Sequence, residues 1–246
     1  HPSTALQVKV LLGLRAAFWR LRFLGGLMRT KVFVDGYNLY YGLLRGTRLK
    51  WLDLVALFER YVLHPSPNLL EVRYYTAPVL AKMCDSAESA RRQRIYLQAL
   101  RTLYPMRLQI VEGRMAATKP FLRLVSPINE TPEIDRVQVY DFTEKKTDVN
   151  LACGMLNGAW KGEFEQVVVC SNDSDLEAAF ASIRKYHPQI RLGLVAPIAR
   201  AEARYIASDL KQYAHWSKIL SKSHIAQSQL PERIPGLGIR RPDAWA

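Results

Sequence analysis

The sequence VFVDGYN, residues 32–38, is the strongest indication of the fold, because three apolar residues run directly into the carboxylate of Asp35. A short β-branched and aromatic run of this kind predicts a buried strand, with Asp35 at its carboxyl end. The stretch VVVCSNDSD, residues 167–175, repeats the pattern, since an apolar run leads to Asp173 and Asp175. Open α/β sheets bind ligands at the carboxyl edge of their strands. The two stretches therefore predict one acidic site at one edge of a parallel sheet.

Outward from these stretches, short apolar runs alternate with longer segments of helical period. The expected strands are residues 31–34, 70–75, 108–111, 167–170 and 190–195. The expected helices are residues 52–63, 86–104, 148–160 and 175–186. Such alternation is typical of a doubly wound α/β fold, so we expect a mostly parallel, five-stranded central sheet with helices between its strands. Residues 118–147 are less regular, and we expect a β-excursion over the acidic end there.

Composition divides the chain of 246 residues into three parts. Residues 1–29 are a basic, apolar leader, residues 30–215 form one expected domain, and residues 216–246 read as an extended C-terminal arm. The leader is interrupted by Lys9, Arg15, Arg20 and Arg22, so no transmembrane segment is expected. Two interpretations of it stay open: an amphipathic helix, or a leader that is not native and precedes a natural start at Met28.

The net charge of +13 predicts a surface that attracts polyanions, with nucleic acid as the first partner to consider. An even spread of charge that serves only solubility is the alternative. The three cysteines show no CxxC spacing, so neither a disulfide framework nor a zinc knuckle is indicated. A reducing, cytoplasmic location fits this cysteine usage.

Asp148 opens the expected helix 148–160 and can reach the same edge as Asp35, Asp173 and Asp175. Each acid alone has an ordinary explanation, because carboxylates are favoured at helix N-termini. Several carboxylates close together repel one another unless a cation or a proton offsets them. Hard oxygen ligands without a Cys or His partner select Mg²⁺ or Mn²⁺ over zinc. The sequence therefore favours a divalent metal site.

Three segments resemble the signature segments of NYN domains, in the LabA-like branch of the PIN-like nucleases. They are VFVDGYNLYYG at 32–42, EKKTDVNLA at 144–152 and CSNDSDLEAAF at 170–180. The resemblance runs from about residue 30 to the C-terminus, and it is specific because DGYN after a strand, KxxD and SxDSD occur together.

The resemblance implies a PIN-like (NYN) three-layer sandwich in which the first and fourth strands are adjacent. The family roles make four residues catalytic metal ligands, directly or through water: Asp35, Asp148, Asp173 and Asp175. The same roles make Asn38 a catalytic residue that polarises substrate or water. Asn172 departs from the family pattern, where many relatives have Gly, and this affects how closely the backbone approaches a substrate.

A substrate surface is indicated on the expected helix 86–104, where Arg91, Arg94 and Arg101 recur at helical spacing and can hold phosphates. A solvated helix face is the alternative. Tyr37, followed by Tyr40 and Tyr41, can stack on unpaired bases and so favours single-stranded RNA, although packing explains these tyrosines equally well.

The resulting expectation is a metal-dependent ribonuclease that activates water for attack on a phosphodiester. A GxSxG nucleophile motif is missing from the sequence. One alternative is an NAD(P)H-dependent hydroxylase of a pyridine compound such as 6-hydroxy-3-succinoylpyridine, a label that some NYN-like proteins carry. The missing GxGxxG turn argues against it. A non-catalytic RNA-binding regulatory module is the other alternative, and a homo-oligomer is left open.

Overall fold

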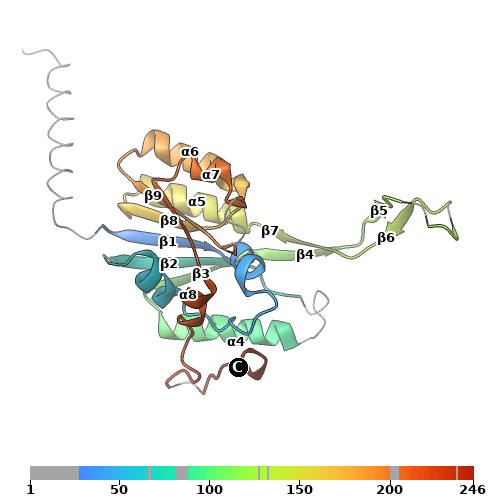
Figure 1. The fold of residues 1–246 in the computed structure, drawn as a ribbon, viewed down its shortest axis with the longest axis horizontal. Coiled ribbons are helices and arrows are strands. Elements are labelled where there is room, and N and C mark those ends of the chain that lie inside the picture. The colour runs from blue at the N-terminus through green and yellow to red at the C-terminus, as the bar shows by residue number, and fades with distance from the viewer. Residues whose placement is uncertain are drawn as a thin grey trace, which may run out of the picture.

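A six-stranded, fully parallel sheet runs through the middle of the protein (Figure 1). The computed structural model describes residues 28–65, 68–80, 88–126, 128–131, 133–199, 205–236 and 238–246. The strands are β1 (Thr30–Asp35), β2 (Leu69–Thr76), β3 (Leu108–Glu112), β8 (Gln166–Cys170), β9 (Arg191–Ala196) and β10 (Trp216–Ile219). Their order is β10-β9-β8-β1-β2-β3, so β1 and β8, which lead to the two acidic stretches, are neighbours.

The expected α/β architecture with a mostly parallel sheet is confirmed, and the number of strands is corrected from five to six. The additional strand is β10, at the edge of the sheet beside β9. Residues 216–246 are therefore not simply an extended arm, because their first four residues complete the sheet. Beyond β10, Leu220, Ile225 and Leu230 are buried in the core. This segment looks polar in sequence because its apolar residues are widely spaced.

Helices cover both faces of the sheet and make three layers (Figure 1). One face carries α5 (Thr147–Trp160), α6 (Glu177–Tyr186) and α7 (Ser208–Lys211), and the other carries α4 (Glu88–Leu103) and α8 (Lys222–Ala226). Strand alternation explains the two layers, since Val32 and Val34 face the α4 side while Phe33 packs against residues of α5. Among the described residues, we find no helix with the length and apolar character needed to cross a membrane.

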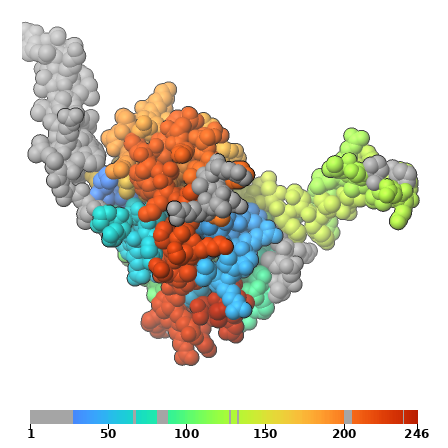
Figure 2. Space-filling view, viewed as in Figure 1, coloured from blue at the N-terminus to red at the C-terminus, as the bar shows by residue number. Residues whose placement is uncertain are grey.

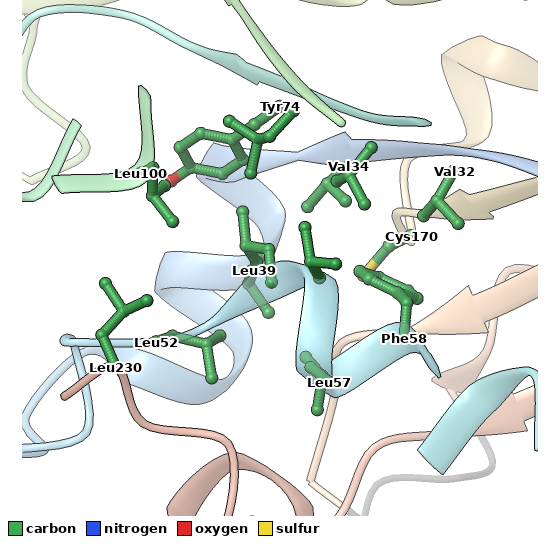
Figure 3. Packing of buried hydrophobic residues seen from close by; sticks show 14 of the residues in the cluster. Val32, Val34, Leu39, Leu52, Leu57, Phe58, Tyr74, Leu100, Cys170 and Leu230 are labelled. Carbon is green, nitrogen blue, oxygen red and sulfur yellow. The ribbon is translucent and has the colours of Figure 1, made fainter. Parts of the chain in front are cut away.

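The segments between the first two strands form short helical turns instead of one regular helix. Residues of α2 (Gly36–Leu39) continue into a π-helical turn over Tyr40–Leu44, and α3 (Leu54–Leu57) continues into another over Phe58–Val62. The helix expected over 52–63 is therefore present in a distorted form. Leu52, Leu57 and Leu230 lie together in the core, which ties the C-terminal segment to the start of the chain (Figure 3).

A β-ribbon, here called the arm and defined as residues 114–145, projects from the carboxyl edge of the sheet (Figures 1 and 2). It consists of two antiparallel pairs: β4 (Arg114–Thr118) with β7 (Asp141–Lys145), and β5 (Phe121–Arg123) with β6 (Arg136–Gln138). A β-excursion was expected over the acidic end, but the arm begins at that end and extends away from the body. The leader, residues 1–29, lies outside the described residues except for Met28 and Arg29.

Candidate metal centre

Asp35 ends β1 and is almost completely buried, with 1% of its surface exposed. Its Oδ1 accepts hydrogen bonds from the backbone N–H groups of Tyr37 (3.0 Å) and Asn38 (2.9 Å), because it caps the short helix α2. Gly36 follows because a Cβ there would lie 2.6 Å from the carbonyl oxygen of Tyr75. The strand-to-helix turn therefore fixes the Asp35 carboxylate at the carboxyl edge of the sheet.

Asp148 and Asp173 come to the same place from two other elements. One carboxylate oxygen from each of Asp35, Asp148 and Asp173 lies within 4.8 Å of the other two. Asp173 follows β8 and caps a short 3₁₀ turn over Ser174–Leu176, and Asp148 lies in the first turn of α5. Lys146, and not Asp148, occupies the N-cap of α5. Capping by Asp148 therefore does not account for its position.

Burial raises the pKa values of Asp35 and Asp148, and neighbouring negative charges add to the shift at Asp148. Burial raises the pKa of Asp35, although hydrogen bonds from Asn38, Ser171 and Tyr37 oppose the shift. Asp148 lies at the surface, and its partial loss of hydration raises its pKa to about 6, with smaller contributions from the negative charges of Asp35, Asp173 and Asp175. A divalent cation relieves such repulsion, and oxygen ligands of this kind suit Mg²⁺ or Mn²⁺. The donor set therefore fits a hard divalent cation.

Asn38 and Ser171 orient the buried carboxylate of Asp35. Asn38 Nδ2 donates to Asp35 Oδ2 at 2.7 Å, and Ser171 Oγ donates to the same oxygen at 2.9 Å. Ser171 Oγ also accepts from the backbone N–H of Asp173 at 3.1 Å. Ser171 thus links two of the three clustered acids, a role that its place inside the SNDSD string does not reveal by itself.

Glu144, on β7 at the base of the arm, is a fourth acid near the centre that we did not single out from the sequence. Its carboxylate accepts a hydrogen bond from the buried Thr147 hydroxyl. Burial raises the pKa of Glu144, and the charges of Asp35 and Asp148 add to the shift. The sequence signal was its place in the EKKTD segment, four residues before Asp148.

Asn172 connects the acidic edge to the loop that follows β9. Its Oδ1 accepts from the backbone N–H of Ala207 at 2.8 Å, and its Nδ2 donates to the carbonyl of Tyr205 at 3.0 Å. The Asn172 backbone N–H in turn donates to Asn38 Oδ1 at 3.2 Å. The Asn172 side chain thus holds a surface loop beside the site.

Tyr37 lines an open pocket of about 290 Å³ next to the acids. The other lining residues are Asn38, Tyr41, Gly42, Asn172, Pro197 and Ile198. The rings of Tyr37 and Tyr41 are 4.6 Å apart, and the guanidinium of Arg45 lies over the Tyr41 ring at 5.2 Å. Tyr40 and Tyr41 are exposed, so the pocket is bordered by accessible aromatic rings.

The remaining expected site residues lie outside the three-carboxylate cluster. Asp175 is exposed, and its backbone N–H donates to Asp173 Oδ1 at 3.0 Å. Arg91, Arg94 and Arg101 lie on α4, which covers the face of the sheet opposite α5. Arg91 pairs with Glu88 and Arg101 with Glu112. The structure therefore does not bring these arginines into the acidic cluster.

The fold and this centre define a class of α/β proteins with acidic residues gathered at the carboxyl edge of a parallel sheet. The chain belongs to the NYN domain family, whose model matches residues 29–220. It is similar to 6-hydroxy-3-succinoylpyridine 3-monooxygenase HspA of Pseudomonas putida, with 35% identity over 238 residues that cover 89% of this chain and 75% of that protein. A solved structure of a Vibrio parahaemolyticus protein of unknown function matches with a TM-score of 0.45 and 13% identity, covering 80% of this chain and 95% of that one.

Proposed function

We propose that the protein is a metal-dependent ribonuclease of the LabA-like branch, acting on single-stranded RNA in the cytoplasm. The observation that carries the proposal is the cluster of Asp35, Asp148 and Asp173, whose carboxylate oxygens lie within 4.8 Å of one another. Membership of the NYN family supports a nuclease-type role. Asp175, which contributes to the raised pKa of Asp148, is proposed as a ligand through water.

A divalent cation supplies Lewis-acid activation of water and neutralises charge on the phosphodiester. The three clustered carboxylates hold the cation, and Asn38 and Ser171 orient Asp35 for this task. The family role for Asn38 is to polarise substrate or water. Its side chain already contacts Asp35 and the Asn172 backbone, which favours a positioning role instead.

Single-stranded RNA is the proposed substrate because accessible aromatic rings and cations lie beside the acids. Tyr37 and Tyr41 border the pocket, Arg45 lies over Tyr41, and Lys50 lies over the Tyr40 ring at 5.9 Å. Unpaired bases stack on such rings, and duplex bases are not available for stacking. The positive net charge adds attraction for phosphates.

The direct test incubates the purified protein with pools of labelled single-stranded RNA, duplex RNA and DNA, each with Mg²⁺, Mn²⁺ or EDTA. We expect cleavage of single-stranded RNA with either metal and none with EDTA. Metal binding without turnover would support the non-catalytic RNA-binding alternative. Cleavage that continues in EDTA would contradict the metal assignment.

Asp173→Asn is the sharpest variant for this assay, because Asn caps a helical turn as well as Asp does while lacking the charge. Cleavage is expected to fall at least about 100-fold with the fold unchanged. Asp35→Asn should also abolish cleavage. It should cost some stability as well, because the new amide NH₂ would replace an oxygen that now accepts a hydrogen bond from Asn38 Nδ2. Asp209→Asn, an exposed site on α7, is the matched control and should retain full activity.

The arginines of α4 provide a separate prediction about substrate binding. If Arg91, Arg94 and Arg101 contact phosphates, changing all three to Gln should weaken RNA binding equally across sequences and flatten its salt dependence. Metal affinity should stay the same. Titration of labelled RNA at several salt concentrations measures both effects. If the RNA affinity of the wild type and of the triple variant depends on salt in the same way, the exposed face of α4 is only solvated and does not bind RNA.

A second candidate function is suggested by the relative named as a monooxygenase of 6-hydroxy-3-succinoylpyridine. In that case the protein would hydroxylate a pyridine compound with NAD(P)H and oxygen. The stretch after β1 argues against it, since VFVDGYN lacks the glycine-rich turn that holds a pyrophosphate and places a buried carboxylate there.

One assay separates the two functions. The protein is mixed with NADH, oxygen and 6-hydroxy-3-succinoylpyridine, and NADH absorbance is followed beside the RNA assay. The ribonuclease proposal predicts no NADH loss above the rate without enzyme. Stoichiometric loss of NADH and of the pyridine, without RNA cleavage, would replace the ribonuclease by the hydroxylase.

A further inference from the structure

The arm, residues 114–145, projects from the body of the protein (Figure 2), and it exposes apolar side chains. Phe121 is 63% exposed, Leu122 is 50% exposed and Val125 is fully exposed. Two-stranded ribbons are at best marginally stable by themselves in water. Several exposed apolar side chains on one projecting element are characteristic of a contact with another molecule. The arm therefore has the properties of a docking element.

The charge of the arm indicates which kind of partner it can bind. The arm contains five basic residues (Arg114, Lys119, Arg123, Arg136 and Lys145) and five acidic ones (Glu130, Glu133, Asp135, Asp141 and Glu144). The whole excess of +13 therefore belongs to the rest of the chain, +5 of it to residues 1–29 and +8 to the body.

The far end of the arm is acidic. Residues 128–135 carry Glu130, Glu133 and Asp135 and no basic residue. An acidic end repels RNA phosphates and is complementary to a basic protein surface. The body of a second copy of this chain offers such a surface wherever the protein itself is present.

We propose that the arm docks on a second copy of this chain, with its acidic end against the basic body of the partner and its apolar side chains buried between the copies. In a symmetric pair each arm contacts the other body, so the contact is made twice. This proposal goes beyond the ribonuclease activity and does not depend on it.

The arm also leads directly into the acidic centre. Met115 and Glu144 are paired across β4 and β7 at its base, and β7 leads through Lys146 to Asp148. The element that docks on a partner therefore carries Glu144 at its base and leads through Lys146 to Asp148.

The test measures molar mass in solution for the full chain by sedimentation over a wide concentration series. The wild type is expected at twice the 28.1 kDa chain mass, with dissociation on dilution and at high salt. A triple variant, Phe121→Ser, Leu122→Ser and Val125→Ser, is expected to raise the dimer dissociation constant more than tenfold. Met106→Ser, whose side chain is 88% exposed on the body, is the matched control and should stay dimeric.

A second variant keeps the test decisive if the serine variant folds poorly. Glu130→Lys, Glu133→Lys and Asp135→Lys together reverse the charge of the exposed arm end and leave its apolar residues intact. This variant should also be monomeric, with an unchanged circular dichroism spectrum. A wild type that sediments as a monomer throughout would overturn the proposal, as would a dimer unaffected by both variants. If the wild type is a monomer and the serine variant loses RNA binding, the arm is a contact for RNA and not for a second copy. Because mass is measured without RNA, failure here leaves the ribonuclease proposal intact.

Discussion

Asp35 illustrates at the residue scale how a carboxylate is kept in a protein interior. Both of its oxygens accept two hydrogen bonds, one pair from backbone N–H groups and one from Asn38 and Ser171. Burial of a charge without such partners costs several kcal/mol, about 1–3 even for a neutral polar group. The surrounding residues therefore hold the Asp35 carboxylate in place at the buried carboxyl edge of the sheet.

Asp148→Asn should raise the stability of the metal-free protein at neutral pH. The pKa of Asp148 is raised from 3.8 to about 6, so its ionised form is less stable in the folded state than in the unfolded state. Below about pH 4 both states bind the proton and the penalty is absent. As pH rises through 6, the wild type loses stability that the Asn variant keeps.

Thermal unfolding in EDTA at about pH 4.5, 6 and 7.5 measures this effect, because the protonation of Asp148 in the folded state changes across this range. The gain from Asp148→Asn should grow across the series, and Asp209→Asn should show no such trend. A variant that is less stable than the wild type at neutral pH would show that Asp148 makes a favourable contact and not a repulsive one.

The clustered acids could be predicted from the sequence because two of them follow apolar strands and the third opens a helix. The sequence pattern predicts Asp35, Asp148 and Asp173 at one edge of the sheet, and the three carboxylates lie together in the structure. The contributions of Ser171, Asn172 and Glu144 could not be predicted in this way. They depend on side-chain contacts across more than 30 residues or on the course of the arm.

At the scale of elements, the turn between β7 and α5 sets the position of Asp148. Lys146 adopts a left-handed backbone with φ of 79°, which is unusual for a residue other than Gly. The left-handed conformation costs a residue with a Cβ about 1–2 kcal/mol. It allows the chain to leave the ribbon and enter the helix within one residue, which brings Asp148 to the cluster.

Lys146→Gly should therefore stabilise the protein by about 0.5–1 kcal/mol, because the relieved conformational cost exceeds the extra chain entropy of Gly. Urea unfolding measures the change. Lys145→Gly, on the neighbouring strand position paired with Arg114, is the control and should be destabilising. Equal effects of the two substitutions would contradict a special backbone at Lys146.

Regular elements were predictable where a single pattern dominates and less so where packing decides. The five strands expected from the sequence and the helix α4 match their expected positions closely, whereas β10 was not expected. The segment 52–63 carries a helical pattern but forms α3 and a π-helical turn, where Phe58 packs beside Cys170 (Figure 3). The spacing of apolar residues along the sequence does not reveal where an α-helix continues into a π-helical turn, because that depends on packing against the neighbouring layer.

At the scale of the whole molecule, the C-terminal segment closes the core that the first part of the chain begins. Leu230 is 3% exposed, and its backbone N–H donates to the carbonyl of Trp51 at 2.8 Å. Trp51 Nε1 donates to the Pro231 carbonyl at 2.8 Å, which repeats the link. This role could not be read from a polar, proline-rich segment, because it depends on contacts about 180 residues away.

Leu230→Ala should cost about 2–5 kcal/mol in the free energy of unfolding, because it opens a cavity next to Leu52 and Leu57. Met106→Ala, at a site that is 88% exposed, should change stability by less than about 0.5 kcal/mol. Urea unfolding of both variants checks the pair. A small effect of Leu230→Ala would mean that the C-terminal segment does not complete the core.

The proposed site for a divalent cation consists of Asp35, Asp148 and Asp173. It can be tested by anomalous X-ray scattering from crystals grown with Mn²⁺, for the wild type and for Asp173→Asn. We expect an anomalous peak about 2.0–2.3 Å from carboxylate oxygens of these residues in the wild type, and a weak or absent peak in the variant. A strong peak elsewhere, with none among the three carboxylates, would contradict it.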